Sequence, residues 1–283
     1  RMIGVDLDGT LLGRDGRVSD AHLAAVRRAR DAGVLVVPCT GRGWRESLHP
    51  LKQLNGEGPG VFITGASIAD VATGAALDLA VIDPHLALEI VENLHDEPEA
   101  SLVFHDEQSV GYDYLVTGRG ELSENTRWWF ERTGASVRFE KRVTLDDLHH
   151  ALRVCVVATE RRIGQMKNHL RRHMEGRILF HSFEAVQKPE TGESLHIMEI
   201  FAPGVDKWRG LTWIADDRGI AHHEIAVIGD EVNDLGMIAS SGCGVAMGNA
   251  IDSVKAVANH VTRDCEHDGV AHAIDRLMDG AWG

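Results

Sequence analysis

The chain has 283 residues, of which 43% are hydrophobic and 25% charged, and its formal net charge is −14. This composition is typical of a globular protein, and the length predicts about two domains. The acidic balance argues against nonspecific binding to nucleic acid or to an anionic membrane, and no apolar run is long enough to span a bilayer.

The cysteines indicate a reducing environment. Cys39, Cys155, Cys243 and Cys265 are widely spaced and form no CxxC pair, so the sequence favours neither a zinc site nor a disulfide framework. The sequence also starts directly on a strand pattern, which leaves no room for a signal peptide. We therefore expect a cytoplasmic protein.

Strand and helix patterns alternate over residues 1–80. Ile3 to Val5 predicts a strand, and the turn signal Asp15-Gly16 predicts a small hairpin beside it. Ser19 or Asp20 can cap a helix that ends near Gly33. Further predicted elements are a strand at 34–37, a helix at 44–54 and a strand at 61–63. Such an alternation indicates a parallel sheet with crossover helices.

The pattern changes between about residues 79 and 192. The predicted elements there are helices at 84–94, 121–133 and 160–174, and strands at 101–105, 111–116, 137–139, 154–158 and 178–183. This mixture indicates an inserted α+β domain, and Pro189 to Gly192 is typical of a linker that returns to the first domain. The basic residues of the helix at 160–174 are predicted to face solvent, with contact to an anionic substrate as the alternative.

The first pattern then returns. Strands are predicted at 196–200, 225–229 and within 244–250, and helices open near 204 and 231. We therefore expect an α/β fold. Its core domain is a doubly wound parallel-sheet (Rossmann-like) domain formed by residues 1–80 and 190–283, and residues 81–189 form the inserted α+β domain.

Two carboxylates end the first strand. Asp6 and Asp8 flank one apolar residue, so both project to the same side of an extended strand end. Their repulsion requires a cation or a shared proton, and oxygen-only ligands favour Mg²⁺. One carboxylate can attack phosphorus to form an aspartyl phosphate, while the other exchanges protons with the leaving oxygen and with water. The alternative is a solvated Asp-Gly turn, in which neither acid has a chemical role.

Three further groups carry complementary chemistry. Thr40, Gly41 and Arg42 follow the second strand, Lys207 opens a helix, and an acidic loop after the strand at 225–229 holds Asp230, Asn233 and Asp234. In parallel α/β sheets, ligands bind beyond the carboxyl ends of the strands. Phosphoryl transfer from a monoester needs a nucleophile, a metal held by carboxylates, donors and a cation for the nonbridging oxygens, and an acid for the leaving group.

The order and content of these pieces resemble the haloacid dehalogenase superfamily of phosphotransferases. The four motifs are Asp6 to Thr10, Thr40 to Arg42, Lys207, and Gly229 to Asp234. The runs Gly244 to Ala250 and Glu266 to Ala271, together with the insert, resemble the Cof-type subgroup (type IIB), whose insert is a large α/β cap of the C2 type. The resemblance implies that the insert at 81–189 is such a cap, which closes over the site and selects the leaving group.

The resemblance also implies a role for each motif residue. Asp6 would be the nucleophile and Asp8 the general acid and base. Mg²⁺ would be held by the Asp6 carboxylate, the Asp8 backbone carbonyl and Asp230, with Asn233 and Asp234 ordering the metal's waters and the Lys207 ammonium. The catalytic residues implied are Asp6, Asp8, Thr40 and Lys207, and the phosphate-binding residues are Gly41, Arg42, Lys207 and Asn233. Two roles stay open for Arg42, which can bind substrate or pair with an acid.

Two positions depart from the subgroup's pattern. Thr64 stands where the subgroup often has Asn, which puts any contact from that Asn in doubt, and Trp208 stands where Gly often follows the motif Lys. A Trp at that place packs on the core or narrows the mouth of the pocket, and the general burial of Trp favours packing.

We therefore predict a Mg²⁺-dependent hydrolase of a small phosphorylated metabolite, such as a sugar or cofactor phosphate, that acts through an aspartyl phosphate. One alternative is a phosphomutase of sugar phosphates, which uses the same first step. Another is a non-catalytic protein that binds a phosphorylated metabolite, although the intact acid pair argues against it. Halide release is disfavoured because it has no need of Asp8. The expected partner is the substrate, and the chain is expected to be a monomer or a homodimer; the sequence does not identify the substrate.

Overall fold

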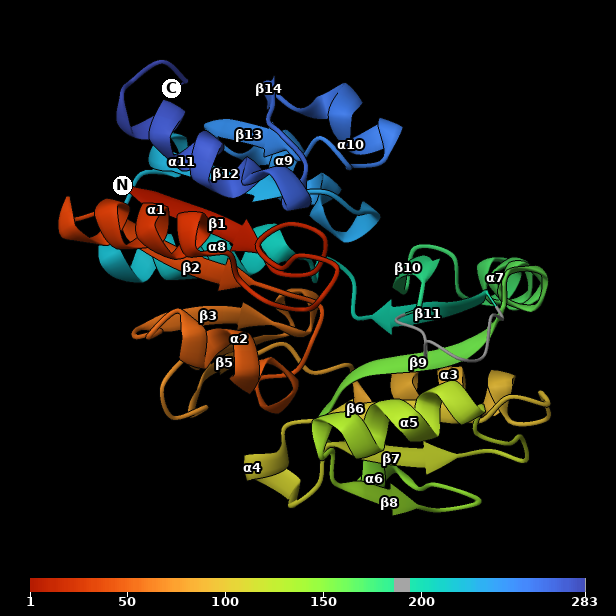
Figure 1. The fold of residues 1–283 in the computed structure, drawn as a ribbon. Coiled ribbons are helices and arrows are strands. Elements are labelled where there is room, and N and C mark those ends of the chain that lie inside the picture. The colour runs from red at the N-terminus through yellow and green to blue at the C-terminus, as the bar shows by residue number, and fades with distance from the viewer. Residues whose placement is uncertain (186–193, 283) are drawn as a thin grey trace. The chain divides into compact units, whose positions relative to one another are not determined.

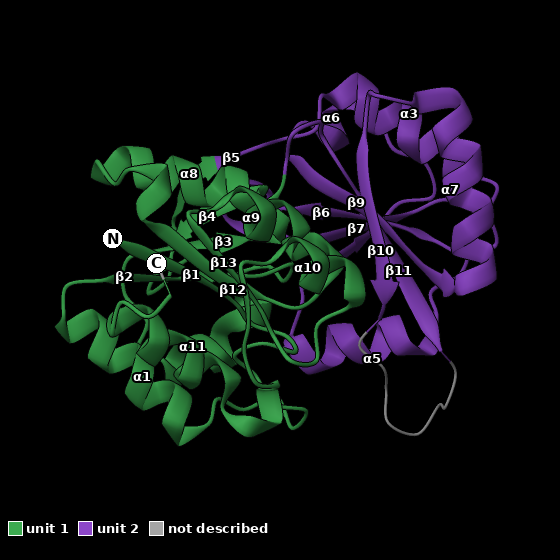
Figure 2. Cartoon of the chain, turned by 90° about the horizontal axis from the view of Figure 1, so that it is seen from above, with its two compact units in different colours: residues 1–78, 206–283 green, residues 79–205 purple. Residues whose placement is uncertain are grey.

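The computed structural model describes residues 1–185 and 194–282. The chain divides into two compact units, the first comprising Arg1–Asp78 and Asp206–Gly283 and the second Leu79–Val205, as Figure 2 shows. The predicted core resumed at residue 190, whereas the first unit resumes at Asp206, because the strand Leu195–Phe201 (β11) pairs with strands of the second unit. The predicted return linker, Pro189 to Gly192, lies outside the described residues.

An eight-stranded sheet runs through the first unit, in the order β14-β13-β12-β1-β2-β3-β4-β5. The strands are β1 (Met2–Asp6), β2 (Leu35–Cys39), β3 (Pro59–Phe62), β4 (Ser67–Asp70), β5 (Ala76–Leu79), β12 (Ile225–Gly229), β13 (Cys243–Ala246) and β14 (His260–Val261). The strands from β14 to β3 are parallel, and β4 is antiparallel to β3. The predicted parallel sheet is confirmed, with an antiparallel extension at one side.

Helices cover both faces of this sheet. They are α1 (Asp20–Asp31), α2 (Leu48–Gln53), α8 (Lys207–Arg218), α9 (Leu235–Ser240), α10 (Asp252–Val257) and α11 (Gly269–Met278). Helices α1 and α11 pack together on one face, and α8 and α9 pack together on the other (Figure 1). Strand β1 is buried along its whole length, as expected of a central parallel strand with both faces covered.

Local signals explain where α1 begins. The Ser19 hydroxyl accepts a hydrogen bond from the backbone N–H of His22 at 3.1 Å, so Ser19 rather than Asp20 is the N-cap. Ala25, Val26 and Ala29 form its buried face. Upstream, an antiparallel bridge joins Leu12 to Val18, in agreement with the predicted small hairpin.

The second unit is built on a six-stranded sheet in the order β10-β11-β9-β6-β7-β8. Besides β11, its strands are β6 (Ser101–His105), β7 (Tyr114–Thr117), β8 (Val137–Phe139), β9 (Ala151–Thr159) and β10 (Leu179–Glu184), and its helices are α3 (Pro84–Leu94), α4 (Glu107–Val110), α5 (Glu124–Thr133), α6 (Leu145–Leu148) and α7 (Glu160–Met174). All strand pairs are antiparallel except β7 with β8. The sheet is mixed, as an α+β insert requires.

Helix α7 separates apolar from basic residues. Ile163, Met166 and Leu170 are buried in the core of the second unit, whereas Arg161, Arg171 and Arg172 are exposed. These three residues lie on the solvated face of the helix, as predicted. Arg162 and Lys167 are instead partly buried, and they donate to Glu99 and to the Ser182 hydroxyl. Within the part of the chain that the structure describes, no helix has both the length and the apolar character needed to cross a membrane.

Candidate active site

Three neighbouring strands of the first unit bring the predicted motifs together. Strand β1 ends at Asp6, β2 ends one residue before Thr40, and β12 ends one residue before Asp230. Because β1 lies between β2 and β12 and is parallel to both, the carboxyl ends of the three strands meet at one edge of the sheet. Lys207 is the first residue of α8, whose N-cap is Asp206.

Lys207 is the centre of the site. Its side chain is fully buried, and its ammonium donates to Asp6 Oδ1 and Asp234 Oδ1, both at 2.6 Å, and to Asn233 Oδ1 at 3.3 Å. Burial alone would lower the pKa of Lys207, but the Asp234 and Asp6 carboxylates outweigh it and raise the pKa above its ordinary value. Lys207 is therefore a fixed positive charge.

The carboxylates outnumber this cation. Burial raises the pKa of Asp6 well above its ordinary value; Lys207 opposes the rise, whereas the charges of Asp234, Asp230 and Asp8 add to it. Burial, followed by the charge of Asp234, raises the pKa of Asp230 to about 7, against a hydrogen bond from the Thr10 hydroxyl to Asp230 Oδ1 at 2.8 Å. The site has excess negative charge that a cation would compensate.

A divalent metal fits this arrangement. One carboxylate oxygen from each of Asp6, Asp230 and Asp234 lies within 4.8 Å of the other two. Asp234 is already engaged, because Oδ1 accepts from Lys207 and Oδ2 accepts from the N–H groups of Asp230 and Glu231 at 2.9 and 3.1 Å. Asp234 thus accepts three hydrogen bonds, whereas Asp230 accepts one at each oxygen and Asp6 accepts one from Lys207. Asp6 and Asp230 therefore keep more free lone pairs for direct coordination, and oxygen-only donors suit a hard cation such as Mg²⁺.

The loop after β2 places Thr40 and Gly41 beside this cluster. Thr40 is fully buried, and its hydroxyl accepts from the Arg42 N–H at 3.1 Å. A Cβ atom added to Gly41 would lie 3.4 Å from Asn233 Nδ2 and 3.4 Å from Thr64 Oγ1. Asn233 therefore faces the loop after β2 as well as Lys207.

Arg42 pairs with an acid, which is one of the two roles left open for it, and its binding of substrate stays a prediction. Its guanidinium donates through Nε to Asp8 Oδ2 at 2.7 Å and through Nη2 to Asp8 Oδ1. A third bond runs from Nη1 to the carbonyl of Glu46 at 3.4 Å. The planar fork of Arg matches a carboxylate in this way, so Asp8 is held in one orientation.

The structure shows what surrounds both departures from the subgroup's pattern, and the backbone at Thr64 favours the subgroup's Asn over the Thr found here. Thr64 has φ 54° and ψ 31°, in the left-handed region that Asn tolerates better than a β-branched residue does. Trp208 is partly buried and packs against the core of the first unit. Its ring lies edge-on to that of His222, with 5.9 Å between the ring centroids. The packing interpretation of Trp208 is confirmed.

Sequence reasoning gave no role to two residues of the site. The hydroxyl of Thr10 and the amide of Asn249 both donate to the carboxylate of Asp230. Thr10 lies within the first motif, and Asn249 lies within the run 244–250 that carries the subgroup resemblance, but neither position by itself indicated its partner.

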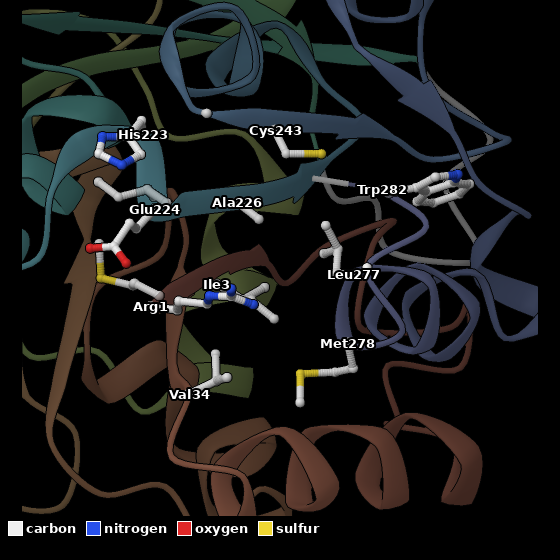
Figure 3. A pocket seen from close by; sticks show the side chains of 14 residues that line it. Arg1, Ile3, Val34, His223, Glu224, Ala226, Cys243, Leu277, Met278 and Trp282 are labelled. Carbon is white, nitrogen blue, oxygen red and sulfur yellow. The ribbon is translucent and has the colours of Figure 1, made fainter.

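A cavity of about 340 Å³ lies at the other end of the same sheet. It is lined by residues at the start of β1, β12 and β13, including Ile3, Ala226 and Cys243, and by Leu277, Met278 and Trp282 near the C-terminus (Figure 3). None of the predicted site residues lines this cavity.

The chain is similar to known proteins over almost its whole length. The family model described as haloacid dehalogenase-like hydrolase matches residues 3–274. The chain is 29% identical to the 5-amino-6-(5-phospho-D-ribitylamino)uracil phosphatase YwtE of Bacillus subtilis, over all of this chain and 99% of that protein. It is 28% identical to the pyridoxal phosphate phosphatase YbhA of Escherichia coli, over 97% of each chain. The structure of a HAD/COF-like hydrolase from Plasmodium vivax shares the fold, with a TM-score of 0.78 and 21% identity over 98% of this chain and 95% of the other.

Proposed function

The chain belongs to the haloacid dehalogenase-like hydrolase family, Cof-type subgroup, and is a phosphatase; from this premise we propose that it hydrolyses small phosphate monoesters through an aspartyl phosphate on Asp6. The observation that carries the proposal is the buried Lys207 ammonium, bonded to both Asp6 and Asp234 beside Asp230. A cation fixed next to the attacking carboxylate stabilises negative charge that develops on the transferring phosphoryl group.

In the proposed first step, a carboxylate oxygen of Asp6 attacks phosphorus. The new bond joins Asp6 to phosphorus, and the bond from phosphorus to the ester oxygen breaks. Asp8 gives its proton to that oxygen, so the alcohol leaves neutral. The hydroxyl of Thr40 and the amide of Gly41, which lie beside the cluster, bind nonbridging oxygens during the transfer.

In the second step, water attacks the same phosphorus. Asp8, now a carboxylate, takes the proton of the water, the bond between phosphorus and Asp6 breaks, and inorganic phosphate leaves. Asp8 thereby regains the proton that the next cycle needs. Its pairing with Arg42 fits this second step, since the guanidinium orients the carboxylate form of Asp8, which is the form that takes the proton.

We propose Mg²⁺ as the metal, held by Asp6, Asp230 and the backbone carbonyl of Asp8. When bound, it neutralises phosphoryl charge and aligns the phosphate for in-line attack. Asn233 and Asp234 orient Lys207 through the bonds described above. The excess of buried carboxylate over cation supports the metal, because burial of unpaired negative charge is unfavourable.

The proposed substrates are small phosphorylated metabolites in which the phosphate ester is carried by a polyol, a sugar or a heterocycle. This range follows from the similarity to a phosphatase of 5-amino-6-(5-phospho-D-ribitylamino)uracil and to a pyridoxal phosphate phosphatase. A cytoplasmic location stays a prediction from the sequence, as does the choice between monomer and homodimer.

The test is phosphate release from 5-amino-6-(5-phospho-D-ribitylamino)uracil, pyridoxal phosphate and a set of sugar phosphates, with Mg²⁺ and with a chelator. Asp6→Asn removes the nucleophile. Asp275→Asn is the matched control, because Asp275 is a half-exposed acid of the same unit that pairs with Arg28 at 2.5 Å. We expect Mg²⁺-dependent release by the wild type and by Asp275→Asn and none by Asp6→Asn. Turnover by Asp6→Asn would disprove the role of Asp6.

A further inference from the structure

The segment that follows β13 contacts the carboxylate of Asp230 and the loop after β1 at the same point. Asn249 Nδ2 donates to the Gly9 carbonyl at 2.8 Å and to Asp230 Oδ2 at 3.1 Å. The other end of this amide is also engaged, because Asn249 Oδ1 accepts from the backbone N–H of Cys265 at 3.0 Å. The amide is thus held from both ends, and it links three stretches of chain that are distant in sequence.

Asp230 is consequently fixed through both of its oxygens. The Thr10 hydroxyl donates to Oδ1 and Asn249 donates to Oδ2. Two donors on opposite oxygens determine the plane of a carboxylate. Gly9 has φ 74°, and a Cβ at this position would overlap Asp230 Oδ2, so the loop fits closely against the carboxylate.

The same C-terminal segment contacts the loop at two later points. The backbone N–H of Arg14 donates to Glu266 Oε1 at 2.7 Å, and the Ser19 hydroxyl donates to Asp268 Oδ1 at 2.8 Å. Hydrogen bonds from the C-terminal part of the chain therefore hold the loop at Gly9, at Arg14 and at Ser19.

We propose that Asn249, Glu266 and Asp268, named here the C-terminal clasp, are positioning residues for the active site. Asn249 sets the orientation of the Asp230 carboxylate toward the metal, and Glu266 and Asp268 hold the loop that leaves the Asp8 turn. This inference rests on the proposed function, in which Asp230 is a metal ligand. Mg²⁺ requires near-ideal ligand geometry, and the hydrogen-bond partners of a ligating carboxylate set that geometry.

The first experiment measures Mg²⁺ binding to metal-free protein by calorimetry. Asn249→Ala removes the hydrogen bonds to Asp230 Oδ2 and to the Gly9 carbonyl but leaves the one from Thr10, and we expect the Kd for Mg²⁺ to rise about 10-fold. We also expect phosphate release by this variant to recover when Mg²⁺ is raised. Asn259→Ala is the matched control, because Asn259 Oδ1 accepts from the Gly244 N–H of β13 at 2.7 Å without a bond to Asp230 or the loop.

An unchanged Kd in Asn249→Ala would overturn the role of Asn249, and so would an equal rise in Asn259→Ala, which would point to a general loss of structure. The proposed function fails in a different way: the wild type would then bind no Mg²⁺ and release no phosphate from any substrate of the panel.

The second experiment compares two variants of Glu266 by the rate at which backbone amide hydrogens exchange with solvent deuterium. Glu266→Gln keeps an oxygen that can accept from the Arg14 N–H, whereas Glu266→Ala removes it. We expect amides of residues 10–18 to exchange about fivefold faster in Glu266→Ala only, which corresponds to the loss of one ordinary hydrogen bond. Wild-type exchange in Glu266→Ala, or equally fast exchange in Glu266→Gln, would overturn the role of Glu266.

Discussion

The guanidinium of Arg42 and the carboxylate of Asp8 are joined by two hydrogen bonds, one to each carboxylate oxygen. Arg42 follows β2 and Asp8 follows β1, so neighbouring strands supply the two partners. The Arg42 side chain is 20% exposed and that of Asp8 is 44% exposed. The proposed acid and base is thus accessible, yet it is held in one orientation by the residue next to the phosphate-binding loop.

Arg42→Lys should reduce kcat about 10-fold with a smaller change in KM. Lys keeps the charge but cannot form the planar fork, so Asp8 loses its fixed orientation. Steady-state kinetics on any accepted phosphate monoester measures this. Arg28→Lys, which alters a half-exposed pair with Asp275, is the control and should leave kcat unchanged. Equal kinetic parameters for Arg42→Lys and the wild type would contradict the positioning of Asp8.

Asp8→Asn should trap phosphorylated protein. With p-nitrophenyl phosphate the leaving group needs little help from an acid, so Asp6 can still be phosphorylated, but the step that requires a base for water becomes slow. We expect a burst of p-nitrophenol followed by slow turnover, together with a mass increase of one phosphoryl group on the acid-quenched protein. The double variant Asp6→Asn/Asp8→Asn should show neither. A burst without protein phosphorylation would exclude the covalent intermediate.

Binding of Mg²⁺ should weaken by about 10-fold between pH 8 and pH 6. The pKa of Asp230 is about 7 in the metal-free protein because of burial and the charge of Asp234, and a metal binds the deprotonated carboxylate. Binding near pH 7 should also release a proton, which calorimetry detects in buffers of different ionisation enthalpy. A Kd that does not change with pH would contradict the role of Asp230 as a ligand.

The same titration predicts how the stability of the metal-free protein depends on pH. Because the pKa of Asp230 is raised on folding, the folded state binds more protons than the unfolded state between about pH 4 and 7. The free energy of unfolding should therefore fall as pH rises through this window. Thermal unfolding of the wild type and of Asp230→Asn checks this, since the variant should lose that part of the pH dependence.

Lys207→Met should abolish phosphate release and lower the free energy of unfolding by about 3 kcal/mol. Removing the cation leaves Asp6 and Asp234 as buried, unpaired carboxylates, and breaking a buried ion pair from one side is strongly destabilising. Urea unfolding measures the change. The double variant Lys207→Met/Asp234→Asn should regain part of the stability without regaining activity. A Lys207→Met protein as stable as the wild type would contradict the ion-pair network.

Thr64→Asn should raise the free energy of unfolding by about 0.5 to 1 kcal/mol. Thr64 occupies the left-handed region with φ 54°, where Asn is better tolerated than a β-branched side chain. Chemical denaturation of the metal-free protein measures the effect. The reverse change at Asn55, an exposed residue with φ 44°, provides the control, because Asn55→Thr should lower stability. Destabilisation by Thr64→Asn would show that side-chain packing outweighs the backbone preference.

Much of the fold and the gathering of the site followed from local signals. A β-strand that ends on an acid, a Ser before an amphipathic helix and a Lys at a helix start are each visible within a few residues, because hydrogen-bond capacity and hydrophobic period are local properties. Parallel strands then bring their carboxyl ends to one edge, which is why Asp6, Thr40 and Asp230 were expected together. Lys207 opens α8 and was expected beside them from the family resemblance, and its ammonium bonds to Asp6 and Asp234.

Tertiary structure alone decided which partner each group takes. The pattern at 196–200 indicates a strand but not its neighbours, so the pairing of β11 with β9 and β10 moved the boundary between the units. The sequence left two roles open for Arg42, and only the folded chain shows that its guanidinium reaches Asp8. Asn249 contacts Gly9 across 240 positions of sequence. Contacts of this kind depend on which surfaces lie side by side after folding. The residues adjacent to Arg42 or Asn249 in the sequence do not determine which surfaces those are.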